Sequence, residues 1–186
     1  LENLLYVSHE EDLTDTDHDI LEFFTNNIAV AYDNIRMREM VESSQKELSY
    51  ILGEAVEKRS KETGSHVKRV ANYSYMLGLY YGLPSKFAEQ IKLASPLHDV
   101  GKIGIPDAVL NKPAKLDPDE WEVMKTHAQL GYDILSQSQN EILQIGANIA
   151  HQHHERWDGK GYPQGLAGED IDIVGRITAL ADVFDA

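Results

Sequence analysis

The sequence predicts an all-α protein in which a long helical segment precedes a compact helical domain. Apolar residues recur at intervals of three and four along most of the chain, as amphipathic helices require. No strand and helix patterns alternate, and we find no internal repeat or low-complexity run. With 186 residues and 42% hydrophobic content, the chain can bury one sizeable core. One short strand over residues 1–8 is the single β element that we expect.

The N-terminal segment has a helical pattern from about Asp17. Its apolar residues form two sets, the second in a shifted register: Leu21, Phe24, Ile28, Ala31 and Ile35, then Val41, Leu48, Ile51 and Ala55. This pattern predicts one long helix or two nearly continuous helices. Because the apolar seam is narrow and its register breaks, an ordinary core helix and a coiled-coil helix that forms a homodimer stay open at equal weight.

Further helices are expected after Gly64. They cover residues 65–83, 84–99, 117–134, 141–154 and 171–186. Ser85 is the expected N-cap of the second of these helices. Asp117 begins the third, with Pro118 at the first helical position and Glu120 at the third. The stretches 100–115 and 155–170 are rich in glycine and proline, so we expect ordered loops there.

Charge and composition exclude several classes of function. The chain has 31 acidic residues against 17 basic ones, a net charge of −14, which argues against binding of duplex nucleic acid. It has no cysteine, hence no disulfide and no thiolate metal site, which suits a reducing cytoplasm. No apolar stretch approaches the roughly 20 residues that span a bilayer. Because the chain starts without Met and ends on the apolar run ITALADVFDA, we expect a fragment of a longer protein.

Histidines and acidic residues gather on the inner edges of the expected helices. The set is Glu62, His66, His98, Asp99, His127, His153, His154 and Asp182. A lone histidine on an apolar stripe is usually a hydrogen-bonded core residue, and His9, His18 and His151 fit that structural interpretation. Eight such groups are hard to satisfy independently, because each buried unpaired group costs about 1–3 kcal/mol. A shared metal cluster would satisfy them together.

The donor types indicate which ions such a cluster holds. Imidazole and carboxylate ligands suit Fe, Mn or Zn. Eight ligands suit two or three ions, with Asp99 placed to bridge them. Two neighbouring ions lower the pKa of a water molecule and clamp the oxygens of a phosphodiester. Lys102, one turn after Asp99 and flanked by glycines, would place an ammonium near the phosphate; the alternative is a surface charge.

Two long motifs, LHDVGKIGIPDAVL and HHERWDGKGYP, resemble those of the HD-GYP family, a branch of the HD phosphohydrolase superfamily. The resemblance covers roughly Ser60 to the end of the chain. It implies an HD-type helical bundle with a centre of two or three divalent ions, Fe or Mn. It also implies hydrolysis of the bacterial second messenger cyclic di-GMP to pGpG and often on to GMP, in the cytoplasm.

Residue by residue, the resemblance implies a role for every member of the cluster. His66, His98, Asp99, His127, His153, His154 and Asp182 match the family's metal ligands, with Asp99 bridging and Lys102 contacting the scissile phosphate. Glu62 matches an acid of members with three metals, so a trinuclear site is preferred. Gly161, Tyr162 and Pro163 match the namesake loop, which shapes the pocket rim or docks partners such as diguanylate cyclase domains; a tight turn that packs Tyr162 is an equal alternative.

The domain organisation follows from two resemblances. Residues 1–45 are similar to the last strand and helix of GAF-like sensory domains, so we expect the tail of an upstream sensory module and a linker helix. Residues 46–186 are expected to form the HD-GYP domain. The family continues beyond ADVFDA into a segment with basic residues that grip the substrate, so we expect this domain to be C-terminally incomplete.

The expected function is metal-dependent hydrolysis of cyclic di-GMP, by metal-activated hydroxide attack on the phosphodiester. Three alternatives stay open. The first is a phosphohydrolase for another cyclic dinucleotide. The second is a non-catalytic cyclic di-GMP receptor or docking module, against which the intact ligand set argues. The third is a structural helical bundle, which leaves Lys102 and the carboxylates unexplained.

Overall fold

The computed structural model describes residues 12–60 and 65–186, and it confirms the all-α prediction. No described residue belongs to a sheet, and Asp158 pairs with Ala167 in an isolated bridge only. The strand expected over residues 1–8 lies outside the described residues. The chain divides into two compact units, residues 1–45 and residues 46–186. No helix in the described ranges has the length and apolar character needed to cross a membrane.

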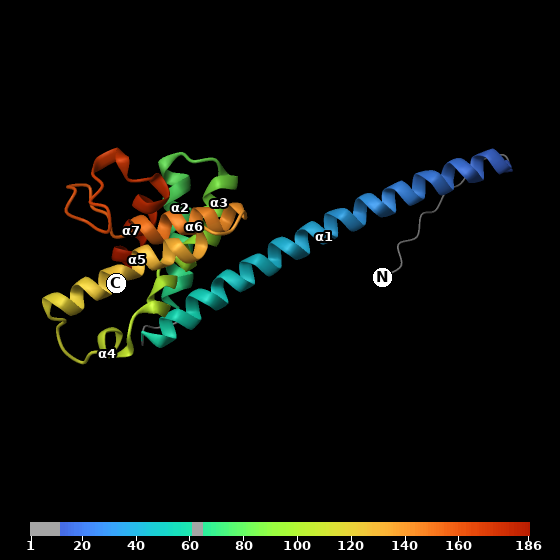
Figure 1. The fold of residues 1–186 in the computed structure, drawn as a ribbon. Helices are drawn as coiled ribbons and strands as arrows, with labels where there is room; N and C mark the ends of the chain where they lie inside the picture. The colour runs from blue at the N-terminus through green and yellow to red at the C-terminus, as the bar shows by residue number, and fades with distance from the viewer. Residues whose placement is uncertain (1–11, 61–64) are drawn as a thin grey trace. The chain divides into compact units, whose positions relative to one another are not determined.

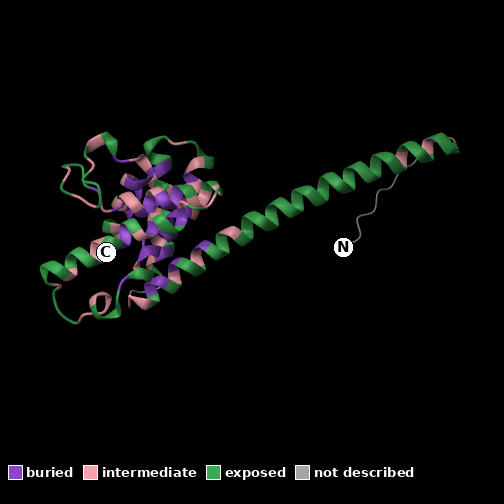
Figure 2. Cartoon of the chain, viewed as in Figure 1, coloured by how far each residue is buried: buried purple, intermediate pink, exposed green. Residues whose placement is uncertain are grey.

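Helix α1 (Asp15–Arg59) is one continuous helix, so the first of the two predicted forms is correct (Figure 1). Its residues 22–44 are all exposed, and Figure 2 shows this stretch in the exposed colour. Phe23 and Phe24 have 72% and 60% of their surface accessible. No other part of the described chain covers that stretch, so the choice between a core helix and a coiled-coil helix stays a prediction. Burial starts only in the second unit, at Ser49, Gly53, Val56 and Glu57.

The second unit contains the remaining elements in a compact bundle (Figure 1). The α-helices are α2 (His66–Tyr81), α3 (Ser85–Ala94), α4 (Asp107–Leu110), α5 (Pro118–Leu135), α6 (Glu141–Gln152) and α7 (Ile173–Asp185). Three 3-10 helices connect them: η1 (Ser95–Leu97), η2 (Val100–Gly104) and η3 (Gly168–Asp170). The region 100–115 is thus not a plain loop as predicted, because η2 and α4 lie within it.

Local sequence signals set most helix ends. Asp117 and Glu120 form the predicted capping box of α5, each side chain accepting from the other residue's backbone N–H. The prediction for Ser85 is wrong: Pro84 is the N-cap of α3, with φ −55° and ψ 138°, and Ser85 is the first helical residue. The fixed φ of proline places the turn into the helix one residue earlier than the serine signal suggests.

Two apolar clusters hold the second unit together. One joins α3, α6 and α7 through Ile91, Ala94, Ile145, Ile149, Val174 and Ile177. The other joins the end of α1, the η1–η2 region, α5 and α6 through Val56, Leu97, Val100, Leu135, Ala147 and Ala150. Full burial of the valine, leucine and isoleucine side chains among these residues contributes about 1.5–3 kcal/mol each. This packing fixes the ends of α3, α5 and α6 against one another and against the η1–η2 region, where His98 and Asp99 lie.

Candidate metal centre

His98 and Asp99 lie at the junction of η1 and η2, where both side chains turn inward as predicted. His98 is 1% exposed and Asp99 is 8% exposed. Two short 3-10 helices meet here, so the backbone changes direction between the two residues. Gly101 lets η2 approach α5 closely, because a Cβ at this position would lie 1.9 Å from the carbonyl oxygen of His127. The centre therefore depends on backbone contact between these two elements.

Three buried histidines are anchored in the same way. In His98, His127 and His153, Nδ1–H donates to a main-chain carbonyl three residues earlier. The acceptors are Ser95, Met124 and Ala150, at 2.8, 2.7 and 3.0 Å. A bond of this kind fixes the tautomer and the ring orientation, and it leaves Nε2 as the atom that can bind a metal.

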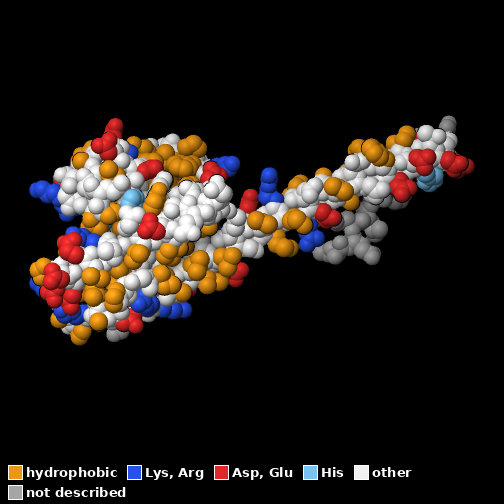
Figure 3. Space-filling model, viewed as in Figure 1, with side chains coloured by type: hydrophobic (Ala, Val, Ile, Leu, Met, Phe, Trp, Pro, Cys, Tyr) orange, Lys and Arg blue, Asp and Glu red, His pale blue; other side chains and the backbone are white. Residues whose placement is uncertain are grey.

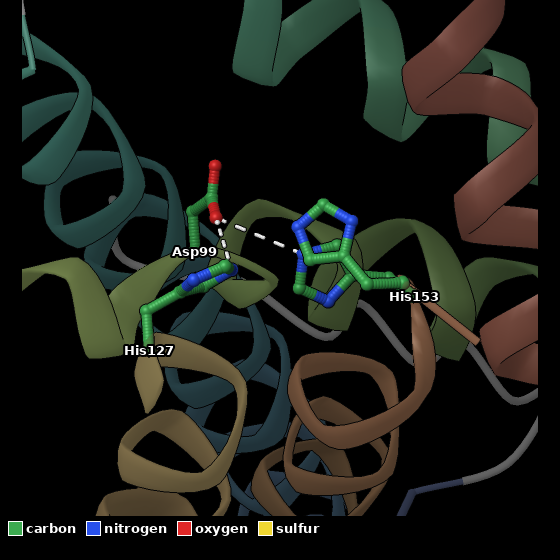
Figure 4. A group of neighbouring side chains, drawn as sticks. Asp99, His127 and His153 are labelled. Carbon is green, nitrogen blue, oxygen red and sulfur yellow. Dashed lines mark ion pairs between the residues drawn. The ribbon is translucent and has the colours of Figure 1, made fainter. Parts of the chain in front are cut away.

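The Nε2 atoms of these three histidines lie close to the Asp99 carboxylate. Figure 4 shows the ion pairs of His127 and His153 with Asp99. Asp99 Oδ1 lies 3.3 Å from Nε2 of His127 and 3.7 Å from Nε2 of His153. Asp99 Oδ1 and the three Nε2 atoms are buried and have no hydrogen-bond partner among the described residues. Burial lowers the pKa of His127 to about 4, although Asp99 opposes the shift. At His127, a neutral Nε2 therefore faces a carboxylate oxygen, so that two acceptors meet, and a cation between them would resolve this conflict.

The predicted ligands fall into two groups. The Asp99 group comprises Asp99, His127, His153 and His154, and the His66 group comprises His66, His98 and Asp182. Within each group the ligand atoms lie within 4.8 Å of one another. The structure thus brings together seven of the eight residues that the sequence singled out as ligands. The eighth, Glu62, lies outside the described residues.

Asp99 links the two groups. Its Oδ1 faces the Asp99 group, while its Oδ2 lies 3.3 Å from Nε2 of His98 in the His66 group. In the His66 group, Asp182 Oδ1 is 3.1 Å from Nε2 of His66 and 4.0 Å from Nε2 of His98. The two carboxylate oxygens of Asp99 thus face different ligand groups.

The charges around Asp99 favour its ionised form. Burial raises the pKa of Asp99, but the charges of His98 and Lys102 outweigh it and hold that pKa well below its usual range. Burial also opposes the charged form of His98, yet Asp99 and Asp182 raise the pKa of His98 to about 9. Lys102 Nζ lies 2.7 Å from Asp99 Oδ2, and the lysine side chain is 14% exposed. Lys102 is therefore not a solvated surface charge.

Two acids beside His66 were missed by the sequence reasoning. Glu57 is 1% exposed, and its Oε1 lies 3.9 Å from Nε2 of His66. Asp185 Oδ2 lies 2.6 Å from Nδ1 of His66. For both acids, the spacing in the sequence could have indicated their position near His66. Glu57 follows Gly53 by four residues on the same helix face, and Asp185 follows Asp182 by three.

The loop 155–170 borders the centre through Tyr162. The ring of Tyr162 stacks on that of His154, with centroids 4.6 Å apart. Gly161 has no room for a side chain, because a Cβ would lie 2.4 Å from the Arg156 nitrogen. The buried carboxylate of Glu155, a further residue that we missed, accepts from three backbone N–H groups and fixes the loop. The donors are Gln164, Gly165 and Leu166, at 2.7, 3.1 and 3.0 Å.

A cavity of about 310 Å³ opens beside this loop. Its lining residues are Glu122, Lys125, Thr126, Gln129, Tyr162 and Pro163. Because Tyr162 contacts His154 on one side and lines the cavity, the cavity and the histidine cluster share a wall. The cavity combines an aromatic ring, an ammonium group and an amide.

The donor set fits divalent transition-metal ions. It offers imidazole nitrogens with fixed tautomers and carboxylate oxygens, and the chain contains no thiolate. Such a mixture suits Fe, Mn and Zn. The convergent acceptor atoms are the structural feature that a cation explains and that an ordinary core does not.

Comparison with known families agrees with this geometry. Residues 51–186 match the family described as HD domain, and residues 1–41 match a domain of unknown function (DUF3369). Because the match over residues 1–41 is to a domain of unknown function, the GAF-like character of this segment stays a prediction. The crystal structure of the cyclic GMP-AMP specific phosphodiesterase V-cGAP3 of V. cholerae superposes with a TM-score of 0.59 at 22% identity, over 75% of this chain and 40% of that one. That likeness supports the helical fold.

Several curated proteins are similar in sequence. The chain is 50% identical over its whole length, and over 36% of the relative, to the 3'3'-cGAMP-specific phosphodiesterase 2 of Vibrio cholerae serotype O1. It is 48% identical to the cyclic di-GMP phosphodiesterase response regulator RpfG of Xanthomonas campestris pv. campestris, over 78% of this chain and 39% of that protein. It is 50% identical to a cyclic di-GMP phosphodiesterase of Thermotoga maritima, over 75% of this chain and 38% of that protein. The chain thus spans little more than a third of the length of these relatives.

Proposed function

This chain belongs to the HD domain family, and from that premise we propose that residues 46–186 form a metal-dependent phosphodiesterase domain that hydrolyses cyclic di-GMP in bacterial second-messenger signalling. The observation that carries the proposal is the convergence of buried imidazole Nε2 atoms on the Asp99 carboxylate. That arrangement favours a metal-dependent enzyme over a structural bundle, because a bundle without metal would leave these buried polar atoms without hydrogen-bond partners, at a cost in free energy.

We propose that each ligand group holds one ion and that Asp99 bridges the two. Fe or Mn is the preferred metal, and Glu62 would serve a third ion. When bound, such ions supply Lewis acidity that polarises phosphoryl oxygens and lowers the pKa of water. The histidines contribute fixed orientation, because their Nδ1–H bonds hold the rings in place before any metal arrives.

Lys102 is proposed to act on the substrate phosphate. Its ammonium group lies beside Asp99 Oδ2, at the point where the two ligand groups meet. The η2 turn holds the lysine three residues after Asp99. In this largely buried position its charge is screened less than at the surface, so it would stabilise negative charge on the phosphate or on the leaving oxygen.

The cavity beside Tyr162 is proposed to receive a base of the substrate, with Gly161, Tyr162 and Pro163 shaping its rim. Its location next to His154 would put a base within reach while the phosphodiester lies at the metal centre. Its volume of about 310 Å³ and its mixed lining are compatible with a purine. Docking of diguanylate cyclase domains on the same loop is the alternative role that we keep.

A second candidate substrate is 3'3'-cGAMP. The observation that favours it is the 50% identity over the whole of this chain to a 3'3'-cGAMP-specific phosphodiesterase. The two substrates share their phosphodiester chemistry and differ in one purine. Relatives named for cyclic di-GMP match the chain at 48% and 50% identity, and we keep cyclic di-GMP as the first candidate. The products are expected to be the linear dinucleotide, the mononucleotides or both.

Residues 15–45 of α1 are proposed to form a homodimer with a second copy. Large apolar side chains lie exposed along this stretch, as Figure 3 shows, among them Ile20, Phe23, Phe24, Ile28 and Ile35. Ile20, Phe24, Ile28 and Ile35 follow one another at intervals of four, four and seven residues, which places them on one side of the helix, as in a helix that packs against another helix. The linker role for residues 1–45 and a cytoplasmic location belong to the same proposal.

The test is a hydrolysis assay of the chain loaded without oxygen with Fe(II) or with Mn(II). Cyclic di-GMP and 3'3'-cGAMP are supplied separately at equal concentration, and products are separated by liquid chromatography. We expect turnover of cyclic di-GMP that a chelator abolishes. Faster turnover of 3'3'-cGAMP would select the second candidate. Binding of both nucleotides without turnover would support a receptor, and absence of bound metal would support a structural bundle.

A further inference from the structure

We propose that Arg69 and Asp185 form a relay that positions His66 and thereby sets the metal affinity of the His66 group. The inference deepens the proposed function, since it concerns the same centre, but it makes a separate claim about metal binding. Arg69 and Asp185 do not point at the metal position themselves. They act through the imidazole of His66, so they are positioning residues.

The contacts form a continuous chain. Asp185 Oδ2 lies 2.6 Å from Nδ1 of His66, and a carboxylate can only accept there, so Nδ1 carries the proton. Arg69 donates to the same carboxylate in two places, from Nε to Oδ1 at 2.5 Å and from Nη2 to Oδ2 at 2.8 Å. The Asp185 side chain is 3% exposed. The guanidinium group thus holds the carboxylate in one orientation, and the carboxylate holds the imidazole.

His66 needs this relay because of its place in the fold. The other three anchored histidines follow a helical turn, whose carbonyl three residues earlier accepts from Nδ1. His66 is the first residue of α2, so no earlier turn of that helix offers such a carbonyl. Its anchor comes from α7 instead. The Nδ1–H tautomer of His66 is therefore set by a side chain, and a single substitution can remove it.

Helix α7 holds both nitrogens of this ring. Asp185 binds Nδ1, while Asp182, three residues earlier, faces Nε2 at 3.1 Å. Because residues three apart share a helix face, both carboxylates reach the same imidazole. A charged anchor also makes Nε2 a better donor to a cation than a neutral carbonyl does. The relay therefore acts on the His66 group and leaves the Asp99 group with its own anchors.

The experiment compares metal binding of the wild-type chain with Asp185→Asn and Arg69→Met. Titration of the metal-free protein with Mn(II) or Zn(II) should show two classes of site, of which Asp185→Asn weakens one by roughly 10–100-fold. Arg69→Met should weaken the same class. Because carboxylates face both ring nitrogens of His66, the ring ¹⁵N shifts of the metal-free protein are recorded at a pH high enough to keep the imidazole neutral. The wild type should then show the Nδ1–H tautomer, and Asp185→Asn should show a mixture of tautomers.

Asp158→Asn is the matched control, because Arg156 and Asp158 form a similar pair on the surface, with Nε and Nη2 at 3.2 and 3.1 Å from the carboxylate. Both metal classes should keep wild-type affinity in that variant. Circular dichroism establishes that each variant keeps its helix content.

A double variant separates positioning from a purely structural ion pair. If Asp185 acts through the imidazole, adding Asp185→Asn to His66→Ala should change metal affinity little further. A full additional loss in the double variant, or wild-type affinity and tautomer in Asp185→Asn, would overturn the relay. None of these measurements uses hydrolysis, so they test the relay even if the wild-type chain turns over neither nucleotide. Conversely, a result that overturns the relay would not contradict the proposed hydrolysis.

Discussion

At the scale of single residues, Asp99 stands where the two ligand groups meet. Oδ1 faces His127 and His153, and Oδ2 faces His98 and Lys102. We expect Asp99→Ala to lower the metal content of both groups and to abolish hydrolysis, because both positions lose a shared ligand. His127→Ala, which alters one group, should leave about half of the metal. Elemental analysis of protein purified without added metal measures this; wild-type metal content in Asp99→Ala would place the centre elsewhere.

Lys102 is the residue at which we expect a loss of catalysis without a loss of metal. Because its ammonium group is proposed to act on the phosphate, Lys102→Ala should keep the bound metal and lose turnover by roughly a hundredfold or more. Lys68→Ala is a suitable comparison, since Lys68 pairs with Glu54 and its side chain is 60% exposed. Metal analysis and steady-state kinetics on the same preparations check both halves. Full turnover in Lys102→Ala would reduce the lysine to a neighbour of Asp99.

At the scale of elements, the contact between η2 and α5 decides whether the centre can form. A Cβ on Gly101 would meet backbone atoms, the His127 oxygen at 1.9 Å and the Gly131 nitrogen at 2.5 Å. A Cβ on Gly104 would meet the end of a movable side chain, Leu130 Cδ1, at 2.8 Å. A side chain can change its rotamer to make room, whereas backbone atoms cannot move without shifting a whole element. A Cβ is therefore tolerated better at Gly104 than at Gly101.

Gly101→Ala should therefore destabilise the second unit by about 3 kcal/mol and lower its metal content, since η2 must move away from α5. Gly104→Ala should cost about 1 kcal/mol or less. Urea unfolding measures the free energies, with elemental analysis alongside. Equal stabilities of the two variants would show that the close approach is not a constraint on the fold.

Elements that depend on neighbouring residues were predictable, and those that depend on distant contacts were not. The capping box of α5 lies within four residues, so the sequence contains all of it. The 3-10 helices η1 and η2 lack a periodic pattern of their own, because they form where α3 ends against α5 and α6. The prediction of Ser85 as the N-cap was wrong for a local reason, because Pro84 already fixes the start of α3.

The residues of the candidate site also divide into those that the sequence predicted and those that depend on distant contacts. Histidines on apolar stripes, such as His127 and His153, were predicted because periodicity places them inside, and they are 2% and 3% exposed. Asp185 was missed because its role depends on a contact with His66, which lies 119 residues away in the sequence. Glu155 was missed because it acts on the backbone of its own loop. Periodicity reveals burial, but it does not reveal which partner a buried group meets.

At the scale of the whole molecule, all seven described candidate ligands lie in the second unit. They come from α2, the η1–η2 junction, α5, the end of α6, and α7. Ions bound there would tie together elements that are far apart in the chain. They would also offset part of the negative charge of a chain whose net charge is −14. The metal centre is thus expected to stabilise the fold as well as to serve catalysis.

Metal removal should therefore lower the thermal stability of the chain. A ligand that binds only the folded state stabilises it by about 2.7 kcal/mol when its free concentration is 100 times Kd. For a domain of this size we expect the Tm to fall by roughly 5–10 °C when a chelator strips the metal. Calorimetry of the loaded and chelated protein measures the shift. Asp99→Ala should show little dependence on chelator, because its centre is already depleted; an equal shift in that variant, or none in the wild type, would mean that metal at this centre does not hold the helices together.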